Sequence, residues 1–391
     1  MGDLRGPEPS ALSPQACVLT APGRGAIAVV RVWGPGAVAA VDAAFRPARG
    51  SGLATSPAGR LRVGRMGAGP GDEVVAVVVE GDPPEVEVQC HGGPAAVGLV
   101  VEAMAAAGAR PRAPIAWARH SAGSSTRAEA AVALGSAATV RAAGILLDQA
   151  EGALEAEFRR IRDAIDSDPA GAVAGLDRLI GRSRVGVRLA GGWRVALAGR
   201  PNVGKSRLLN AMAGFDRAIV DPTPGTTRDV VTVAAAFDGW PVELADTAGL
   251  RDPADPIEAG GIALARARHH RADLVLVVLD RSEPLTDLDR AILAEHPGAP
   301  VVANKCDLPA SWDESAFEAR AVSAERGDGV EALTASVAAR LVPDPPEPGS
   351  GVPFRPIYAR RLAAIRDRLA SGGAARARRS LGRWIERPRI G

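Results

Sequence analysis

The sequence predicts a doubly wound α/β domain with a mostly parallel sheet, inserted in an α-helical domain and preceded by a small α+β domain. Residues 191–340 alternate continuous apolar strands with helical segments, which is typical of a parallel sheet covered by helices on both faces. Tracts rich in Ala, Leu, Arg and Glu, with helical spacing, flank this region at about 125–190 and 358–386. We therefore expect the two helical tracts to form one domain that the α/β unit interrupts, with two long helices in the first tract.

The chain has 391 residues, enough for two or three domains. An N-terminal α+β domain is expected at 1–118 and the first part of the helical domain at 119–190. The α/β domain is expected at 191–340, and a Pro-rich linker with the second part of the helical domain at 341–391.

Short β-rich runs dominate the N-terminal domain. Strands are expected at 26–33, 73–80 and 85–90, with Gly/Pro clusters as turns between them. A helix is expected from about Pro94 to Ala107, where Gly ends it. In the α/β domain the expected strands are the runs WRVALAG, VELADTAG, DLVLVVLD, PVVANKCD and AVSA.

The charge balance argues against a strong overall field, because 47 basic and 45 acidic residues leave a formal net charge of +2. Any nucleic-acid contact must therefore come from a local patch. The Arg-rich stretch RARRSLGRWIERPR is expected to be a solvated helix face. Trp384 within it leaves a nucleic-acid surface as the alternative.

Cysteine usage and hydropathy indicate a cytosolic protein. Cys17, Cys90 and Cys306 are far apart and in no C-x-x-C pair, so neither a disulfide framework nor a zinc site is expected. The first twenty residues contain no apolar signal-peptide core, and no apolar run approaches the roughly 20 residues that span a bilayer. We expect no membrane partner.

Residues 199–206, GRPNVGKS, match G-x-x-x-x-G-K-[ST] and lie between an apolar strand and the start of a helix. In this setting backbone N–H groups surround phosphates, Lys205 reaches the β and γ oxygens, and the Ser206 hydroxyl ligates Mg²⁺. A plain turn would explain Gly199 and Gly204 but not a lysine at this offset.

Two further segments fit the same phosphate site. DTAG, residues 246–249, follows the strand VELA, so Asp246 can hold the magnesium shell and the Gly249 N–H can reach a γ-phosphate. PTPGTTRD, residues 222–229, can close over the γ-phosphate with Thr227 as the second hydroxyl on Mg²⁺; a Pro/Gly turn is the alternative. Leu250 follows DTAG where the Ras type has Gln, so the groups that orient the attacking water must come from elsewhere.

NKCD, residues 304–307, ends the strand PVVA. Asp307 can accept from N1 and N2 of guanine, Asn304 can tie this loop to the phosphate loop, and the Ala324 N–H can donate to O6. Adenine presents a donor where guanine presents O6, so the pattern selects GTP. The residues expected to contact GTP are Asn202, Val203, Gly204, Lys205, Ser206, Arg207, Thr226, Thr227, Asp246, Thr247, Ala248, Gly249, Asn304, Lys305, Asp307, Ser323 and Ala324.

Residue usage strengthens both motifs. Only two of the 47 basic residues are lysine, and the chain has only three asparagines. Four of these five residues, namely Asn202, Lys205, Asn304 and Lys305, lie in the two nucleotide motifs. If composition alone set their positions, these four residues would be scattered along the chain.

These motifs, together with TAPGRGAIAVVRVWGP and QCHGGP in the N-terminal region, resemble the MnmE (TrmE) family of tRNA modification GTPases over nearly the whole chain. The resemblance implies a K⁺ ion that replaces an arginine finger when two GTPase (G) domains dimerise. It assigns this ion to Asn202, Asp221, Thr223 and Thr226.

The resemblance also implies catalytic residues. Glu258, twelve residues after Asp246, would position the attacking water; a solvated carboxylate at a helix start is the alternative. Glu258, Lys205 and Asn202 together form the implied catalytic set.

The family acts with the flavoprotein MnmG to build a carboxymethylaminomethyl-type group at C5 of the wobble uridine of tRNA, with a folate as one-carbon source. The resemblance therefore implies a homodimer through the N-terminal domain and a folate pocket lined by Arg31 and Glu87. Two departures stand out: APIAWARHSAGSST replaces the family pattern between Arg112 and Arg127, and Arg389 stands where the C-terminal C-x-G-K motif has its Cys.

Three functions stay open on the sequence. The first is an MnmE-type GTPase in tRNA modification, and the second is a ribosome-assembly GTPase of the Era or Der type, whose G motifs are nearly the same. The third is a divergent relative that hydrolyses GTP but no longer modifies tRNA, as the two departures suggest.

Overall fold

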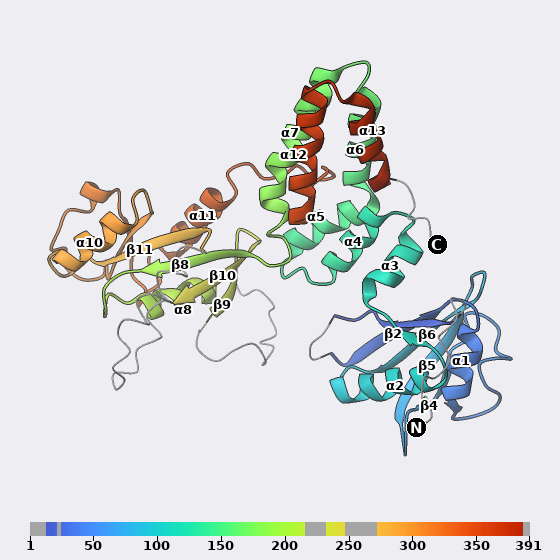
Figure 1. Ribbon diagram of the computed structural model, residues 1–391. Helices are drawn as coiled ribbons and strands as arrows, with labels where there is room; N and C mark the ends of the chain where they lie inside the picture. Colours follow the sequence, from blue (N-terminus) through green and yellow to red (C-terminus); the bar gives the residue numbers. More distant parts are fainter. Residues whose placement is uncertain (1–12, 22–24, 216–231, 247–271, 386–391) are drawn as a thin grey trace, which may run out of the picture. The chain divides into compact units, whose positions relative to one another are not determined.

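Alternating apolar and polar residues build the sheet of the N-terminal region. The computed structural model describes residues 13–21, 25–215, 232–246 and 272–385 (Figure 1). Its first sheet has the order β3-β4-β5-β6-β2-β1-β7, antiparallel throughout except for the β1–β7 pair. The strands are β1 Gln15–Val18, β2 Ile27–Trp33, β3 Arg46–Pro47, β4 Arg62–Met66, β5 Asp72–Val79, β6 Glu85–His91 and β7 Arg110–Pro111.

Two helices, α1 (Ala37–Ala44) and α2 (Pro94–Ala106), cover the apolar face of this sheet. Their buried side chains join those of the strands in one core, with Val30, Val88 and Val100 fully buried. The three predicted strands and the predicted helix are confirmed, while β1, β3, β4 and β7 lacked a strong local signal. Helices α3 (Pro114–Ala122) and α4 (Ser125–Leu134) complete this unit, which ends at Gly135.

The expectation of two long helices over 125–190 is wrong. Besides α4, this stretch holds α5 (Val140–Glu151), α6 (Ala153–Ala164) and α7 (Pro169–Gly186). Gly152 breaks the periodic pattern, because its φ of 111° ends α5 and turns the chain into α6. Asp168 caps α7 by accepting from the Gly171 N–H at 2.9 Å, with Pro169 at the first helical position.

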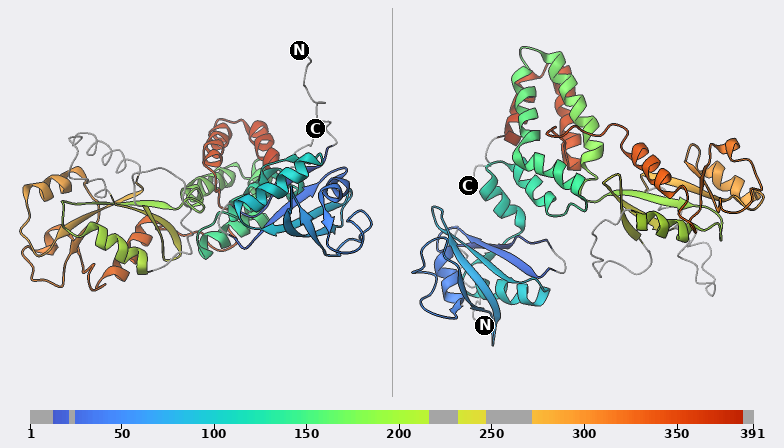
Figure 2. Two further views of the ribbon diagram at one scale, coloured as in Figure 1. Left: turned by 90° about the horizontal axis from the view of Figure 1, so that it is seen from below. Right: turned by 180° about the vertical axis from the view of Figure 1, so that it is seen from behind.

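The C-terminal helices pack against α6 and α7. Helix α12 (Pro356–Ala370) lies on α7, and α13 (Ala374–Ile385) lies on α6, as all views in Figures 1 and 2 show. The Trp384 ring is buried, with its centroid 4.8 Å from Phe158 and 5.5 Å from Tyr358. Trp384 is therefore a core residue, which corrects the alternative that gave it to a nucleic-acid surface.

The second sheet has six strands in the order β13-β12-β11-β8-β10-β9, parallel except for the β10–β9 pair. Its strands are β8 Trp193–Ala198, β9 Thr232–Phe237, β10 Trp240–Asp246, β11 Leu274–Asp280, β12 Val301–Asn304 and β13 Arg320–Val322. The five predicted strands are confirmed, and β9 was not predicted. The described helices of this region are α8 Lys205–Phe215, α10 Asp287–Glu295 and α11 Val330–Leu341, with the 3-10 helix η1 at Glu314–Phe317.

The helices α5 to α7, the second sheet and the C-terminal helices belong to one unit, Ser136–Ile385. Among the described residues, no helix combines the length and the apolar character that crossing a membrane requires.

Candidate nucleotide-binding site

Strand, loop and helix follow one another at the phosphate motif. Strand β8 ends at Ala198 in the middle of the sheet, and α8 begins at Lys205. Because β10 and β11 lie on opposite sides of β8, the strand order reverses here, which is where open parallel sheets bind ligands. The buried Lys205 ammonium donates to the carbonyls of Gly199 at 2.8 Å and Arg200 at 2.7 Å, so it lies folded over its own loop.

The loop conformation requires its glycine. Gly204 has a φ of 94°, and a Cβ there would lie 2.4 Å from Nδ2 of Asn304. Asn202 also has a positive φ, 65°, a conformation that Asn tolerates better than most residues. Two loop positions are thus held in the left-handed region, as is common where a backbone cradles a ligand.

Asn304 connects the two nucleotide motifs. Its side chain, 2 % exposed, donates from Nδ2 to the Val203 carbonyl at 2.8 Å. Its Oδ1 accepts from the Ala324 N–H at 3.1 Å. One buried amide therefore holds the phosphate loop, the NKCD loop and the segment after β13 together, as the sequence predicts for the first two.

The predicted base-reading side chain, that of Asp307, is half-buried and is oriented by its hydrogen bonds. The Ser323 hydroxyl donates to the Asp307 carboxylate and holds its pKa below the ordinary value, with the Asp307 backbone N–H as a further donor. Ser323 is itself fully buried, and its oxygen accepts from the Arg326 N–H at 3.1 Å. An ionised carboxylate held in this way can accept from two neighbouring N–H donors of one ligand.

Lys305 makes an ion pair beside the base loop. Its ammonium lies 2.5 Å from Oδ2 of the buried Asp280, the last residue of β11. Burial alone would raise the pKa of Asp280, but hydrogen bonds from Lys305 and Ser282 outweigh it and lower that pKa.

The expected metal ligands are only partly within the described residues. Ser206 lies in the first turn of α8, where its hydroxyl is suited to Mg²⁺, and Arg207 pairs with Glu325 at 2.5 Å on the surface. Asp246 is the last residue of β10. Among the described residues, no three His, Cys, Asp or Glu side chains form a metal-binding group. The predicted site residues that lie outside the described residues are Asp221, Thr223, Thr226, Thr227, Thr247, Ala248, Gly249 and Glu258.

Three residues of the site were missed by sequence reasoning. Arg200 anchors the phosphate loop, with its Nε 3.2 Å from Oδ2 of the buried Asp289 and its guanidinium against Glu283. Asp280 and Arg281 support the base loop from the end of β11. The place of Asp280 at the carboxyl end of an apolar strand was an available signal, whereas the partners of Arg200 lie more than 80 residues away along the chain.

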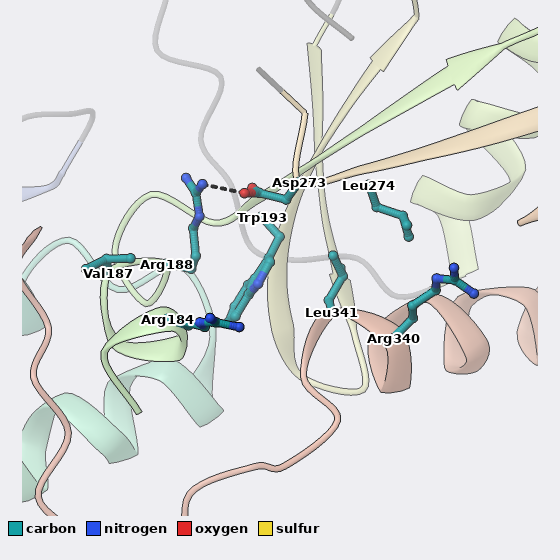
Figure 3. Close-up of a pocket in the computed structure, with 8 residues that line it drawn as sticks. All are labelled: Arg184, Val187, Arg188, Trp193, Asp273, Leu274, Arg340 and Leu341. Carbon is teal, nitrogen blue, oxygen red and sulfur yellow. Dashed lines mark hydrogen bonds and ion pairs between the residues drawn. The ribbon is translucent and has the colours of Figure 1, made fainter. Parts of the chain in front are cut away.

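A separate cavity of about 490 Å³ lies at the opposite edge of the sheet (Figure 3). It is lined by the first residues of β8 and β11, Trp193 and Leu274, and by the end of α11 at Arg340. Since the nucleotide motifs follow the carboxyl ends of the strands, this cavity is not part of the candidate site.

The residues expected to line a folate pocket are paired with each other. Arg31 and Glu87 are opposite in the β2–β6 register, and Arg31 Nη2 donates to Glu87 Oε2 at 2.7 Å. The other Glu87 oxygen accepts from Gln89 at 3.1 Å. The Arg31 guanidinium also lies 4.9 Å over the Trp117 ring. Trp117 belongs to α3, within the stretch that departs from the family pattern.

A lysine-bearing loop between a central strand and a helix, bridged by Asn304 to the loop that carries the predicted base-reading residue, is typical of a P-loop GTPase. A model described as 50S ribosome-binding GTPase matches residues 194–305, and one described as GTP-binding protein TrmE N-terminus matches residues 15–119. Two tRNA modification GTPases MnmE, of Symbiobacterium thermophilum and Chloroflexus aurantiacus, are each 36% identical to this chain. Those alignments cover 83% and 84% of this chain and 81% of either relative. The MnmE of Roseiflexus castenholzii is 34% identical over 91% of this chain and 89% of its own.

The chain therefore belongs to the MnmE family of tRNA modification GTPases. Membership supports the first of the three functions considered above over an assembly factor of the Era or Der type.

Proposed function

We propose that this protein binds GTP at the carboxyl edge of the second sheet and hydrolyses it to drive modification of the wobble uridine of tRNA. The main observation in support of this site is the pair of hydrogen bonds made by the Asn304 side chain. They hold the phosphate loop and the segment after β13 against the loop that contains Asp307. In this proposal Lys205 turns from the carbonyls of its own loop to the β and γ oxygens of GTP, and Asp307 accepts from N1 and N2 of guanine.

Hydrolysis would use groups from several segments. Ser206 and Thr227 would supply hydroxyls to Mg²⁺, and Asp246 would hold its water shell. Mg²⁺ neutralises charge on the β and γ phosphates when it is bound. Asn202 with Asp221, Thr223 and Thr226 would hold K⁺, and the Glu258 carboxylate would orient the attacking water. The positive φ of Asn202 supports its proposed role as a K⁺ ligand, because the backbone there is neither extended nor right-handed helical.

Cation choice tests this mechanism. GTP turnover is expected to be at least tenfold faster in KCl than in NaCl of equal ionic strength, and Glu258→Ala is expected to lose turnover while keeping GDP affinity. Equal rates in the two salts would remove K⁺ from the mechanism, and an active Glu258→Ala variant would remove the assigned water-positioning residue.

The proposed partners are tRNA, an MnmG-type flavoprotein and a second copy of the chain through the N-terminal domain, in the cytoplasm. Family membership and the TrmE N-terminal match support this assignment. Deleting the gene and weighing wobble uridines by mass spectrometry tests it, since loss of the C5 substituent is expected. Unchanged nucleosides, with GTPase activity retained, would favour the divergent relative that no longer modifies tRNA.

A folate is proposed at the Arg31–Glu87 pair, which the family resemblance assigns to the folate pocket. Arg31 Nη2 already donates to Glu87, but the buried Arg31 Nε has no hydrogen-bond partner among the described residues and could donate to a ligand. We assign no chemical step to the folate. Titration with 5-formyltetrahydrofolate, followed by tryptophan fluorescence, tests binding. Trp117 stacks on the Arg31 guanidinium, so its fluorescence should change when a ligand binds at Arg31.

A further inference from the structure

We propose that Arg281 is a positioning residue that fixes the orientation of Asp307 and so sets the selectivity of the site for guanine. The inference rests on the proposed role of Asp307 and names a residue outside the nucleotide motifs. It starts from the contacts of one side chain at the end of β11.

Arg281 is bonded to both neighbours of the base-reading residue. Its Nη1 donates to the carbonyls of Cys306 and Leu308, each at 3.0 Å. Its backbone N–H donates to the Asn304 carbonyl at 2.9 Å. The residues on both sides of Asp307 thus have their carbonyls fixed by one guanidinium, and the start of the loop is fixed by the backbone of the same residue.

The guanidinium is itself held in place. Its Nε pairs with Glu314 of η1, which leaves Nη1 directed at the two carbonyls. The residue before Arg281 is anchored as well, since Asp280 binds Lys305 and the Asp280 carbonyl accepts from Trp312 Nε1 at 2.8 Å. A planar guanidinium presents five donors in a fixed geometry and can make these contacts together, whereas an ammonium has three donors on a single nitrogen.

Asp307 lies between Cys306 and Leu308 and is half-buried. The Ser323 hydroxyl, which comes from another segment, donates to the Asp307 carboxylate. Its position therefore depends on two supports: Ser323 on the carboxylate and Arg281 on the backbone at both sides. Without Arg281, the loop loses the second support, and the Asp307 carboxylate is no longer held in the orientation that lets both oxygens face the N1 and N2 donors of guanine.

The experiment compares GDP with IDP, which lacks the N2 amino group and so one of the two bonds to Asp307. Affinities of full-length wild type, Arg281→Ala, Arg281→Lys and Arg340→Ala are measured by competition against a fluorescent GDP analogue. Arg340 is the matched control, because it also donates to a backbone carbonyl, that of Gly298, but at a distance from the base loop.

Wild type is expected to favour GDP over IDP. Arg281→Ala is expected to reduce this preference roughly 3- to 10-fold, which corresponds to losing one partly exposed hydrogen bond to a charged group. Arg281→Lys should fall between the two, and Arg340→Ala should keep the wild-type ratio. A purely structural role would weaken GDP and IDP by the same factor, so an unchanged ratio in Arg281→Ala would overturn the inference. A wild type with no preference for GDP over IDP would instead overturn the proposed role of Asp307, and the inference with it.

Discussion

The side-chain amide of Asn304 donates to the Val203 carbonyl at 2.8 Å across 101 residues of sequence. Since the same side chain accepts from Ala324, its removal would leave a buried carbonyl and a partly buried N–H without these partners. We expect Asn304→Ala to destabilise the second unit by about 1–3 kcal/mol and to weaken GDP binding at least tenfold. Thermal denaturation and nucleotide titration measure the two effects.

Asn210, exposed on α8, provides the control. Asn210→Ala should leave both GDP affinity and stability near wild type. Equal GDP affinity in Asn304→Ala and wild type would contradict the role of Asn304 as the bridge between the two loops.

Gly204→Ala tests the shape of the phosphate loop. The added methyl group would stand 2.4 Å from Nδ2 of Asn304, at a φ of 94° that Ala adopts only with strain. Loss of measurable GDP binding is expected by calorimetry. Gly214→Ala is the matched control, because no atom lies within 4 Å of the new Cβ in α8. It should bind GDP like wild type and be equally or slightly more stable.

The ion pair of Asp280 predicts a pH-dependent contribution to stability. The folded pKa of Asp280 is below the usual 3.8, so this group stabilises the protein above that pH and the contribution is lost as the pH falls through the folded pKa. Asp280→Asn is therefore expected to cost roughly 1–3 kcal/mol at pH 7. Urea denaturation at several pH values should show the difference from wild type shrinking below about pH 3.8. A difference that is constant with pH would argue against the ion pair as its source.

Arg141 of α5 contacts the turn between β9 and β10. Its guanidinium lies 4.8 Å over the Trp240 ring and donates to the Asp238 carboxylate at 2.7 Å. Because both charged groups are substantially exposed, we expect Arg141→Ala to cost only about 1 kcal/mol, mostly from the ring contact. Asp238→Asn should then cost less than Arg141→Ala in urea denaturation. The exposed Arg194–Glu243 pair is the control, and Arg194→Ala should be near neutral.

The strands and site residues that could be predicted are those for which one short stretch of sequence holds the whole signal. Apolar runs identified β8, β11 and β12. The motifs at the carboxyl ends of β8 and β12 predicted roles for Lys205, Asn304 and Asp307, because each run lies directly beside its loop. The roles of Arg200 and Arg281 depend instead on partners brought close by sheet pairing, which no short pattern encodes.

Errors in the helical region have a similar physical origin. Helical spacing continues through Gly152 with little interruption, yet this residue adopts a φ of 111° and divides one expected helix into α5 and α6. Trp384 stands among arginines in sequence, but helical periodicity turns its ring into the core with Ala377 and Leu381. Composition alone does not distinguish these outcomes.

The chain has only two lysines, and both belong to the nucleotide motifs. Lys205 is 6 % exposed, whereas the Lys305 side chain is 33 % exposed beside Asp280. Apart from an N-terminal amine, an acylating reagent would therefore find its most accessible target at the base loop. Acylation, which labels many lysines in most proteins, would here report whether the region around Lys305 is occupied.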